Sequence, residues 1–468
     1  MAESAPAVRP DVAPRRGVVA PAERRRPRTM GEWFRAVAAT NIVVLVLNLF
    51  TGIVAARVMG PAGKGVFNAV NVWTNVFSGL AGMGLGAAFI SAYTKSAPED
   101  RPRLARAALV LACWWGLAGT VAVYLLEPHL IGHLAPRAAA WARLSSPLVA
   151  IYVIAGVGGT YLSVERRFGT LNWLGFGRNL LYAVAVGSLA LWGLLTPYTQ
   201  LVASWVLLVA GSVLTFVVGI RALPLRAGWV RLRDLLDLSA LGFRYYALSL
   251  LGMFNSQLDQ MISSAWLSAR DMGLYAVAIS SLSVVGSLQG ALGTVMFPMM
   301  AGDSREAVIE RTMRVSRRMA PLFAISVGLV CASAWPILFL LYGRAYLPAV
   351  RVVLLISPTA AFVGAITVFY QAFYALRWFA GPTLGEGMGA TSGALLLWLL
   401  IPRWGLAGAA VAATVSYALD LGVVVWYWCR VSGTRPGDLW PRGEDVRFLY
   451  HELRRVLVLS RILKGVIA

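Results

Sequence analysis

Long apolar runs separated by short polar connections dominate this chain. Each run has about 20 residues or more, the length that a helix needs to cross the roughly 30 Å hydrocarbon core of a bilayer. The runs are continuously apolar, so they predict helices and not the alternating strands of a membrane barrel. We expect about twelve spans, at 35–58, 65–93, 104–126, 147–164, 171–195, 201–221, 243–265, 273–299, 319–341, 352–374, 383–401 and 406–428. The predicted fold class is an all-α membrane protein.

Composition supports lipid as the main solvent of the chain. Of its 468 residues, 58% are hydrophobic and 13% are charged, so a soluble globule could not cover its apolar surface. The formal net charge is +21, which would favour a nucleic-acid partner in a soluble protein. Here the connections on one side carry about twice as many Lys and Arg as those on the other, and both tails add to the richer side. We therefore expect a multi-pass protein of the cytoplasmic membrane with both termini cytoplasmic and no nucleic-acid partner.

The chain divides into two similar sets of six spans. An offset of 208 residues places Gly65-Val66-Phe67 on Gly273-Leu274-Tyr275, and Phe89 on Phe297. Internal duplication is the usual construction of transporters that expose a midplane site alternately to either side, so we expect two pseudo-symmetric lobes around a central cavity. The expected segments are a disordered basic tail at 1–30, an N-lobe at 31–221, an amphipathic cytoplasmic linker at 222–242, a C-lobe at 243–430 and a tail with an amphipathic helix at 431–468.

Uncharged polar residues inside the spans have helical spacing. Asn41 and Asn48 lie seven residues apart, and Asn68, Asn71 and Asn75 follow an i, i+3, i+7 pattern, so each set occupies one helix face. Such amides either line a cavity or hold neighbouring helices together. The same two interpretations apply to two glutamines in later spans, Gln289 and Gln371.

Charged residues inside spans are costly, so each one needs a partner, a route to water or a function. Arg178 is the deepest cation; it either extends to the membrane surface or faces the cavity, where it could bind phosphate. Arg57 and Arg244 lie at span ends and are further cavity candidates, with plain surface anchoring as the alternative for Arg244.

Three acidic residues also fall within predicted spans. Asp259 and Asp420 could form ion pairs, bind a coupling cation or exchange a proton. Glu386 begins its span near Arg377, which favours a surface ion pair.

Other sequence features do not indicate catalysis. The segment 60–65 is glycine-rich, but no Ser or Thr follows Lys64, so it lacks the pattern of a phosphate-binding loop. His129 and His133 supply only two possible ligands, too few for a closed zinc site. We expect no enzyme activity, no cofactor and no metal.

Three stretches resemble a known family. They are Ala56-Arg57-Val58-Met59-Gly60-Pro61-Ala62-Gly63-Lys64-Gly65-Val66-Phe67, then Leu258-Asp259-Gln260-Met261-Ile262 with Gly273-Leu274-Tyr275-Ala276-Val277-Ala278 and Phe297-Pro298, and Gly405-Leu406-Ala407-Gly408-Ala409-Ala410-Val411-Ala412-Ala413-Thr414. They resemble the polysaccharide flippase family of the multidrug, oligosaccharidyl-lipid and polysaccharide exporter superfamily. The resemblance implies two six-helix lobes and a basic cavity that takes the diphosphate and sugars of a polyprenyl-linked oligosaccharide while its lipid tail stays in the bilayer. It also implies membrane lipids, polysaccharide polymerases or glycosyltransferases as candidate partners.

Two other functions remain alternatives at this point. An ion-coupled drug or metabolite antiporter of the same superfamily would have the same lobes but a cavity dominated by acidic and aromatic residues. A membrane-embedded glycosyltransferase or polymerase would need acidic residues in the first outward connection or a large outward domain, and the segment 59–65 has neither.

Overall fold

The computed structural model describes residues 30–165, 167–222, 229–300, 302–445 and 447, and divides into two units, 1–43 and 44–468. The first unit is described only from Met30, where helix α1 begins, so residues 1–29 of the predicted tail lie outside the described residues. Most of the predicted C-terminal amphipathic helix, at 446 and 448–468, also lies outside them. All regular structure within the described residues is helical, which confirms the all-α prediction.

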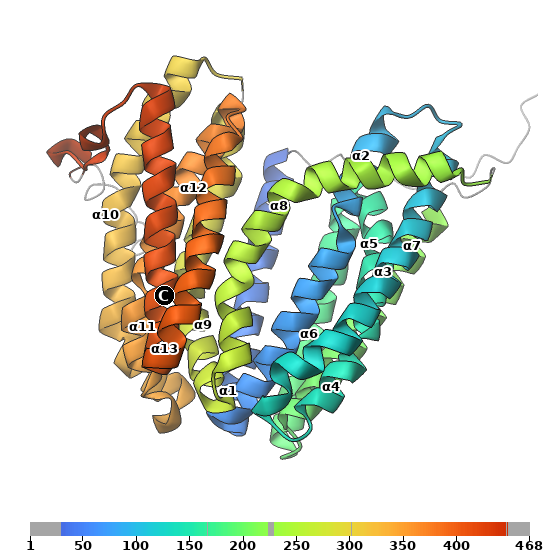
Figure 1. Ribbon diagram of the computed structural model, residues 1–468, viewed down its shortest axis with the longest axis horizontal. Helices are drawn as coiled ribbons and strands as arrows, with labels where there is room; N and C mark the ends of the chain where they lie inside the picture. The colour runs from blue at the N-terminus through green and yellow to red at the C-terminus, as the bar shows by residue number, and fades with distance from the viewer. Residues whose placement is uncertain (1–29, 166, 223–228, 301, 446, 448–468) are drawn as a thin grey trace, which may run out of the picture. The chain divides into compact units, whose positions relative to one another are not determined.

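The helices of the N-lobe follow one another with short connections (Figure 1). They are α1 (Met30–Gly82), α2 (Leu85–Lys95), α3 (Arg101–Ile131), α4 (Ala138–Ser145), α5 (Pro147–Val164), α6 (Phe168–Leu191) and α7 (Pro197–Ala222). The C-lobe contains α8 (Leu232–Trp266), α9 (Ala269–Met300), α10 (Arg305–Ile337), α11 (Ala349–Ile356), α12 (Pro358–Leu376) and α13 (Ala380–Ser432), followed by the short 3₁₀ helix η4 (Pro436–Leu439).

α13 contains two predicted spans, and α1 contains the first predicted span and most of the second, which ends in α2. Gly60 interrupts α1 with φ 68° and Gly405 interrupts α13 with φ 53°, a backbone region that glycine adopts without steric cost. Among the described residues, eight helical segments are long and apolar enough to cross a membrane, and α8 and α9 cover the seventh and eighth expected spans. Every predicted span therefore lies mainly on one helix or on two consecutive helices, in a fold of two lobes with twelve spans. We call the end where α7 finishes and α8 begins the linker end, and the end with Gly60 and Gly405 the far end.

The internal repeat is visible in a second pair of elements. α4 and α11 are both eight residues long, and each is followed by a Ser-Pro pair that starts the next span, Ser146-Pro147 and Ser357-Pro358. The offset is 358 − 147 = 211 residues. Each serine hydroxyl donates to the carbonyl three residues earlier, at 2.8 Å in the N-lobe and 3.2 Å in the C-lobe. The two halves therefore share a local structure that the offset of 208 alone did not identify.

The two lobes touch directly at the far end through a pair of glycines. A Cβ atom on Gly65 would lie 1.8 Å from the carbonyl oxygen of Ala269, and one on Gly273 would lie 1.8 Å from that of Pro61. Both contacts are related by the sequence offset, since 269 − 61 and 273 − 65 both equal 208. We call this the reciprocal glycine contact; only residues without a side chain allow backbones to approach so closely.

Side-chain hydrogen bonds reinforce the far-end junction. The Nδ2 of Asn68 donates to Oε1 of Gln260 at 3.2 Å, and the indole Nε1 of Trp73 donates to Oγ of Ser264 at 2.8 Å. The hydroxyl of Tyr346 donates to the carbonyl oxygen of Ala56 at 3.2 Å. Each bond joins a residue of α1 to a residue of the C-lobe, so the two lobes are joined at the far end.

Helix α8 connects the two lobes at the linker end. Figure 1 shows it (yellow-green) passing the ends of α2 and α3 and then curving to run beside α13. Leu238 is buried in the N-lobe core, and Asp234 forms an ion pair with Arg103 at 3.0 Å. The part of the predicted linker from Leu232 onward is thus continuous with the seventh span and packed against the N-lobe.

Candidate functional site

A pocket with both apolar and polar lining residues lies in the C-lobe, with a volume of about 420 Å³. At 1.5 Å per residue, Ser280 lies about 17 Å from the far-end start of α9 at Ala269, and Tyr417 lies about 18 Å from the kink of α13 at Gly405, roughly midway through a 30 Å core. Its polar lining residues are Ser256, Asp259, Gln260, Ser280, Ser283, Gln289, Thr359 and Tyr417. The C-lobe pocket therefore offers hydroxyl, amide and carboxylate groups at the depth where an isolated polar ligand is hardest to accommodate.

Asp259 is the charged group of this pocket. Its Oδ2 accepts a hydrogen bond from the hydroxyl of Tyr275 at 2.8 Å, and its Oδ1 accepts one from the backbone N–H of Gln260 at 2.8 Å. The ion pairs found among the described residues do not include this carboxylate. Two donors fix its orientation and leave it lining the cavity, where it can accept hydrogen bonds from a ligand or attract a cation.

Asn255, one helical turn before Asp259, holds two further carboxylates together. Its Nδ2 donates to Oε2 of Glu386 at 2.8 Å and to Oδ2 of Asp420 at 3.2 Å. The hydroxyl of Tyr370 lies 3.4 Å from Oδ1 of Asp420. Asp420 is only 1% exposed and Asn255 is 8% exposed. We call these three residues on α8 and α13, Asn255, Glu386 and Asp420, the acidic cluster.

The acidic cluster requires a positive charge or a proton. Two carboxylates that share one amide repel each other strongly in a low-dielectric interior. The predicted ion pair between Glu386 and Arg377 is not among those found in the described part of the chain, where Glu386 bonds to Asn255 instead. The arrangement can therefore exchange protons or hold a monovalent cation with oxygen ligands.

Sequence reasoning missed Asn255, although a signal was present. Asn255 and Asp259 are four residues apart and therefore share one face of α8. The same rule that grouped the asparagines of the second span would have added Asn255 to the candidates.

The predicted amides have different environments. Gln289 is buried at the pocket and donates through Nε2 to the carbonyl oxygen of Ala360, whereas Gln371 is half-buried and packs beside Gly293. Asn71 donates to the carbonyl of Phe67 on its own helix at 2.8 Å. Asn48 and Asn75 are exposed, and the side chain of Asn41 lies outside the described residues. Asn68 reaches the C-lobe pocket indirectly, through its bond to Gln260.

The predicted cations do not line the C-lobe pocket. Arg178 and Arg244 are exposed, and the stem of Arg178 packs against Gly211 of α7, where a Cβ would lie 3.3 Å from its Cδ. Arg57 donates through its guanidinium to the carbonyl oxygens of Leu340 and Leu341, the latter at 2.7 Å. In this conformation Arg57 thus joins the lobes at the far end.

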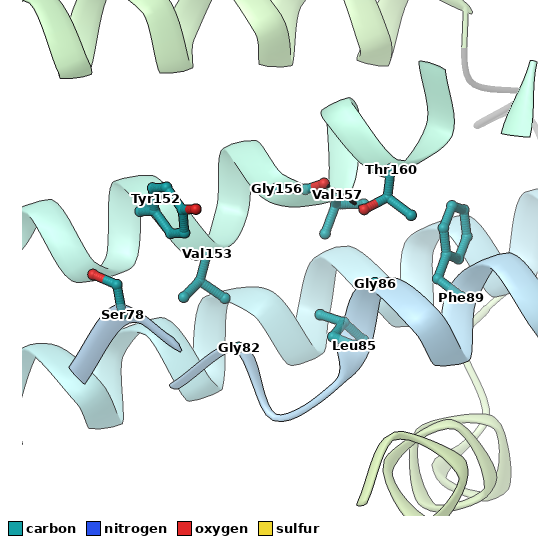
Figure 2. A pocket seen from close by; sticks show the side chains of 10 residues that line it. All are labelled: Ser78, Gly82, Leu85, Gly86, Phe89, Tyr152, Val153, Gly156, Val157 and Thr160. Carbon is teal, nitrogen blue, oxygen red and sulfur yellow. Dashed lines mark hydrogen bonds between the residues drawn. The ribbon is translucent and has the colours of Figure 1, made fainter. Parts of the chain in front are cut away.

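A smaller cavity of about 140 Å³ lies where α1 ends and α2 begins (Figure 2). The chain breaks there at Met83 and Gly84, which have φ angles of 40° and 67°. The hydroxyls of Ser78 and Thr160 on its wall donate to carbonyls of their own helices, at 2.7 and 2.8 Å. Its described lining residues include no charged side chain, whereas those of the C-lobe pocket include Asp259, so the C-lobe pocket is the better candidate for a polar ligand.

Solved membrane transporters have the same fold. The chain resembles a structure described as the lipid II flippase MurJ in an inward closed conformation, with a TM-score of 0.74, 14% identity and coverage of 92% of this chain and 93% of that one. It also resembles an inward-facing multidrug resistance MATE family transporter of the MOP superfamily, with a TM-score of 0.64, 12% identity and coverage of 85% and 98%. At these identities the likeness establishes the fold.

The family is established by a different comparison. No curated protein matches the chain. A model of a family described as polysaccharide biosynthesis protein matches residues 54–351, well over half of the chain. This segment includes the motifs around Gly65 and Gly273 and the pocket residue Asp259. The chain belongs to this family of polysaccharide biosynthesis proteins.

Proposed function

We propose that this protein is a flippase that moves a polyprenyl-diphosphate-linked oligosaccharide across the cytoplasmic membrane for cell-surface polysaccharide biosynthesis. The observation that carries the proposal is the C-lobe pocket, which places hydroxyls, amides and one carboxylate at mid-membrane depth in a chain of a polysaccharide biosynthesis family. Sugars present many hydroxyl groups, and each hydroxyl buried in hydrocarbon without a partner costs about 2–7 kcal/mol. A polar passage through the C-lobe removes much of that barrier.

Asp259 is our candidate for direct sugar contact. An ionised carboxylate accepts several hydrogen bonds, and bonds to a charged acceptor contribute about 1.5–3 kcal/mol each. Gln289, Gln371 and the asparagines Asn41, Asn48, Asn68, Asn71 and Asn75 remain candidates for further polar contacts along the passage.

The diphosphate needs cations, for which we propose Arg178 and Arg244. Both are exposed, and a guanidinium can bind phosphate through two parallel hydrogen bonds. Arg57 is a candidate only when the far end opens, because its donors are now bonded to carbonyls of the C-lobe.

Alternating access would proceed by separation of the lobes at the far end. The reciprocal glycine contact and the bonds of Asn68, Trp73 and Tyr346 would break together, while α8 keeps the linker end connected. With the termini on the cytoplasmic side, as the distribution of Lys and Arg predicts, the far end faces outward. Transport of this kind needs no covalent chemistry.

The acidic cluster supports a second candidate function, an ion-coupled antiporter of the same superfamily. Glu386 and Asp420 lie close enough to share the amide of Asn255, an arrangement suited to binding a proton or a monovalent cation. In the flippase the same cluster would couple glycolipid movement to the gradient of the bound ion, so both functions make it essential for uphill transport.

Reconstituted proteoliposomes test the proposal. We expect the wild type to move a fluorescent polyprenyl-diphosphate oligosaccharide, and Asp259→Asn and Arg178→Ala to lower the initial rate about tenfold or more, as the loss of a charged hydrogen bond would. Arg351→Gln is the matched control, because Arg351 is exposed on α11 near the far end. If the wild type moves no glycolipid but exports small molecules against a proton or sodium gradient, the antiporter replaces the flippase.

A further inference from the structure

A groove at the linker end of α10 lies apart from the transport pocket. It has a volume of about 340 Å³ and is formed by one face of α10, by the last residue of η4 and by the segment that follows η4. Its lining residues are Ala320, Pro321, Ala324, Leu439, Trp440 and Pro441. All six are apolar apart from the indole N–H, so the groove offers almost no hydrogen bonds and is suited to a hydrocarbon chain.

The groove lies at the boundary between the polar and apolar parts of α10. Five arginines occupy the first half of this helix, the last of them Arg318, and the chain then has no Asp, Glu, Lys or Arg until Arg344. Ala320 follows that arginine by two residues, or about 3 Å along the axis. The bilayer interface therefore passes close to the rim of the groove that is nearest to Arg318. Trp440 is 76% exposed, and tryptophans are enriched at membrane interfaces.

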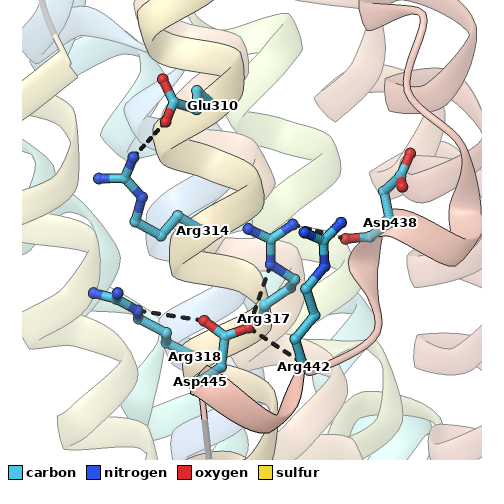
Figure 3. A network of polar contacts seen from close by, with 7 residues as sticks. All are labelled: Glu310, Arg314, Arg317, Arg318, Asp438, Arg442 and Asp445. Atoms are coloured by element: carbon cyan, nitrogen blue, oxygen red, sulfur yellow. Dashed lines mark hydrogen bonds and ion pairs between the residues drawn. The ribbon is translucent and has the colours of Figure 1, made fainter. Parts of the chain in front are cut away.

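The segment that forms one wall is held to α10 by an ionic network (Figure 3). Asp445, 6% exposed, contacts the Nε atoms of Arg317 and Arg318, each at 3.4 Å. The Nη1 of Arg317 also donates to the carbonyl oxygen of Asp438 at 3.2 Å. Because these contacts bracket Leu439, Trp440 and Pro441, they hold the wall of the groove in place.

One cation at the rim points to the charge of the ligand. Arg442 directly follows the groove residue Pro441, and its side chain is exposed. Within the described part of the chain, its backbone N–H joins the network by donating to Oδ2 of Asp445 at 3.1 Å. Arg317 and Arg318 hold the buried carboxylate of Asp445, and Arg442 adds an exposed guanidinium next to them.

We propose that the groove binds an anionic phospholipid of the leaflet at the linker end. One acyl chain lies against Ala320, Ala324 and Trp440, and the phosphate contacts the guanidinium of Arg442. A neutral lipid would fill the groove without using the cations, and a free phosphate would use the cations without filling the groove. The bound lipid would stabilise the docking of the C-terminal segment on α10.

The test measures lipid binding to the purified full-length protein by native mass spectrometry, with phosphatidylglycerol and phosphatidylcholine as probes. We expect the wild type to bind phosphatidylglycerol at least tenfold more tightly. Arg442→Gln removes the rim charge, and Ala324→Phe fills the groove while leaving every arginine in place. Each should weaken phosphatidylglycerol binding about tenfold, whereas Arg351→Gln removes the same charge at the far end and should have no effect.

Several results would overturn the proposal. Equal binding of the two lipids by the wild type would exclude charge selection. Wild-type binding by Ala324→Phe, or full competition by inorganic phosphate, would reduce the site to a surface anion site. Occupation of the groove by the chain's own residues 448–468 would also exclude a lipid, and a photoreactive group placed at Trp440 would then crosslink to that segment instead of to lipid. Thermal unfolding of each variant in detergent without added lipid separates lost binding from lost folding, because Ala324 and Arg442 are both exposed.

Discussion

At the scale of single residues, Asn255 determines whether the acidic cluster can exist. Its side-chain amide donates to both Glu386 and Asp420, and it is 8% exposed. The surrounding backbone is fitted to it, since a Cβ on Gly389 would lie 2.7 Å from its Nδ2. The two carboxylates therefore depend on a side chain of one particular size and hydrogen-bonding capacity.

We predict that Asn255→Leu destabilises the protein by about 1–3 kcal/mol per acceptor left unsatisfied in the interior. Thermal unfolding in detergent measures the loss. Asn75→Leu is the control, because Asn75 is an exposed asparagine in a span. An equal melting temperature for the two variants would mean that the acidic cluster obtains its donors elsewhere.

Some residue roles could be predicted from the sequence and others could not. Asp259 could be predicted as a candidate site residue, because a carboxylate within a membrane span is costly and is usually kept for ion pairing or function. The role of Arg57 was not, because its partners, the carbonyls of Leu340 and Leu341, are 283 and 284 positions away in the chain. Similarly, the proximity of Arg377 suggested an ion pair for Glu386, whereas the three-dimensional fold supplies Asn255.

At the scale of elements, the reciprocal glycine contact determines how closely α1 and α9 approach. A Cβ atom on either glycine would lie 1.8 Å from a backbone oxygen of the other helix, which leaves no room for a side chain. A larger residue must therefore force the two helices apart. Because both halves contribute the same position, substitution in either half should have the same effect.

We predict that Gly65→Val and Gly273→Val each open the far end. The readout is the reaction of a cysteine at position 68 with a membrane-impermeant maleimide, in a background where the three native cysteines are replaced. Labelling should rise severalfold in both variants and stay unchanged in Gly328→Val, because a Cβ at Gly328 meets no atom within 4 Å. Opening by only one of the two glycine variants would contradict the reciprocal contact.

Helices as units were predicted well, and their ends less well. Continuous apolar runs of about 20 residues identify membrane helices because lipid leaves the backbone no other hydrogen-bonding partners. Hydropathy predicts that the seventh span begins at Phe243. The helix itself begins at Leu232, since its amphipathic first turns pack on the N-lobe core through Leu238.

At the scale of the whole molecule, the lobes are connected at both ends. The reciprocal glycine contact and the bonds of Asn68, Trp73 and Tyr346 form the far-end junction, and α8 connects the lobes at the linker end. Bonds such as Asn68 to Gln260 must break for the far end to open, whereas α8 must remain intact. Transport should therefore stop when the far-end junction is made permanent.

We predict that Asn68→Cys with Gln260→Cys, joined by a short bifunctional methanethiosulfonate, loses transport and recovers it after reduction. The proteoliposome assay for glycolipid measures both states. Tyr182→Cys with Gln200→Cys is the matched control, because these hydrogen-bonded residues, 2.8 Å apart, both belong to the N-lobe. Transport that continues through the first crosslink would mean that the lobes do not separate at this point.

The continuity of α8 also limits how such a protein can change in evolution. A single inserted residue between Leu238 and Asn255 would turn everything after it by about 100°, so Asn255 would lose Glu386 and Asp420 while Leu238 stayed in the N-lobe core. An insertion of seven residues would nearly restore the phase but lengthen the helix by about 10 Å. Between α7 and α8, length variation among related chains should therefore be confined to the connection that ends at Leu232. The same connection is where the protein could be cut into two co-expressed halves.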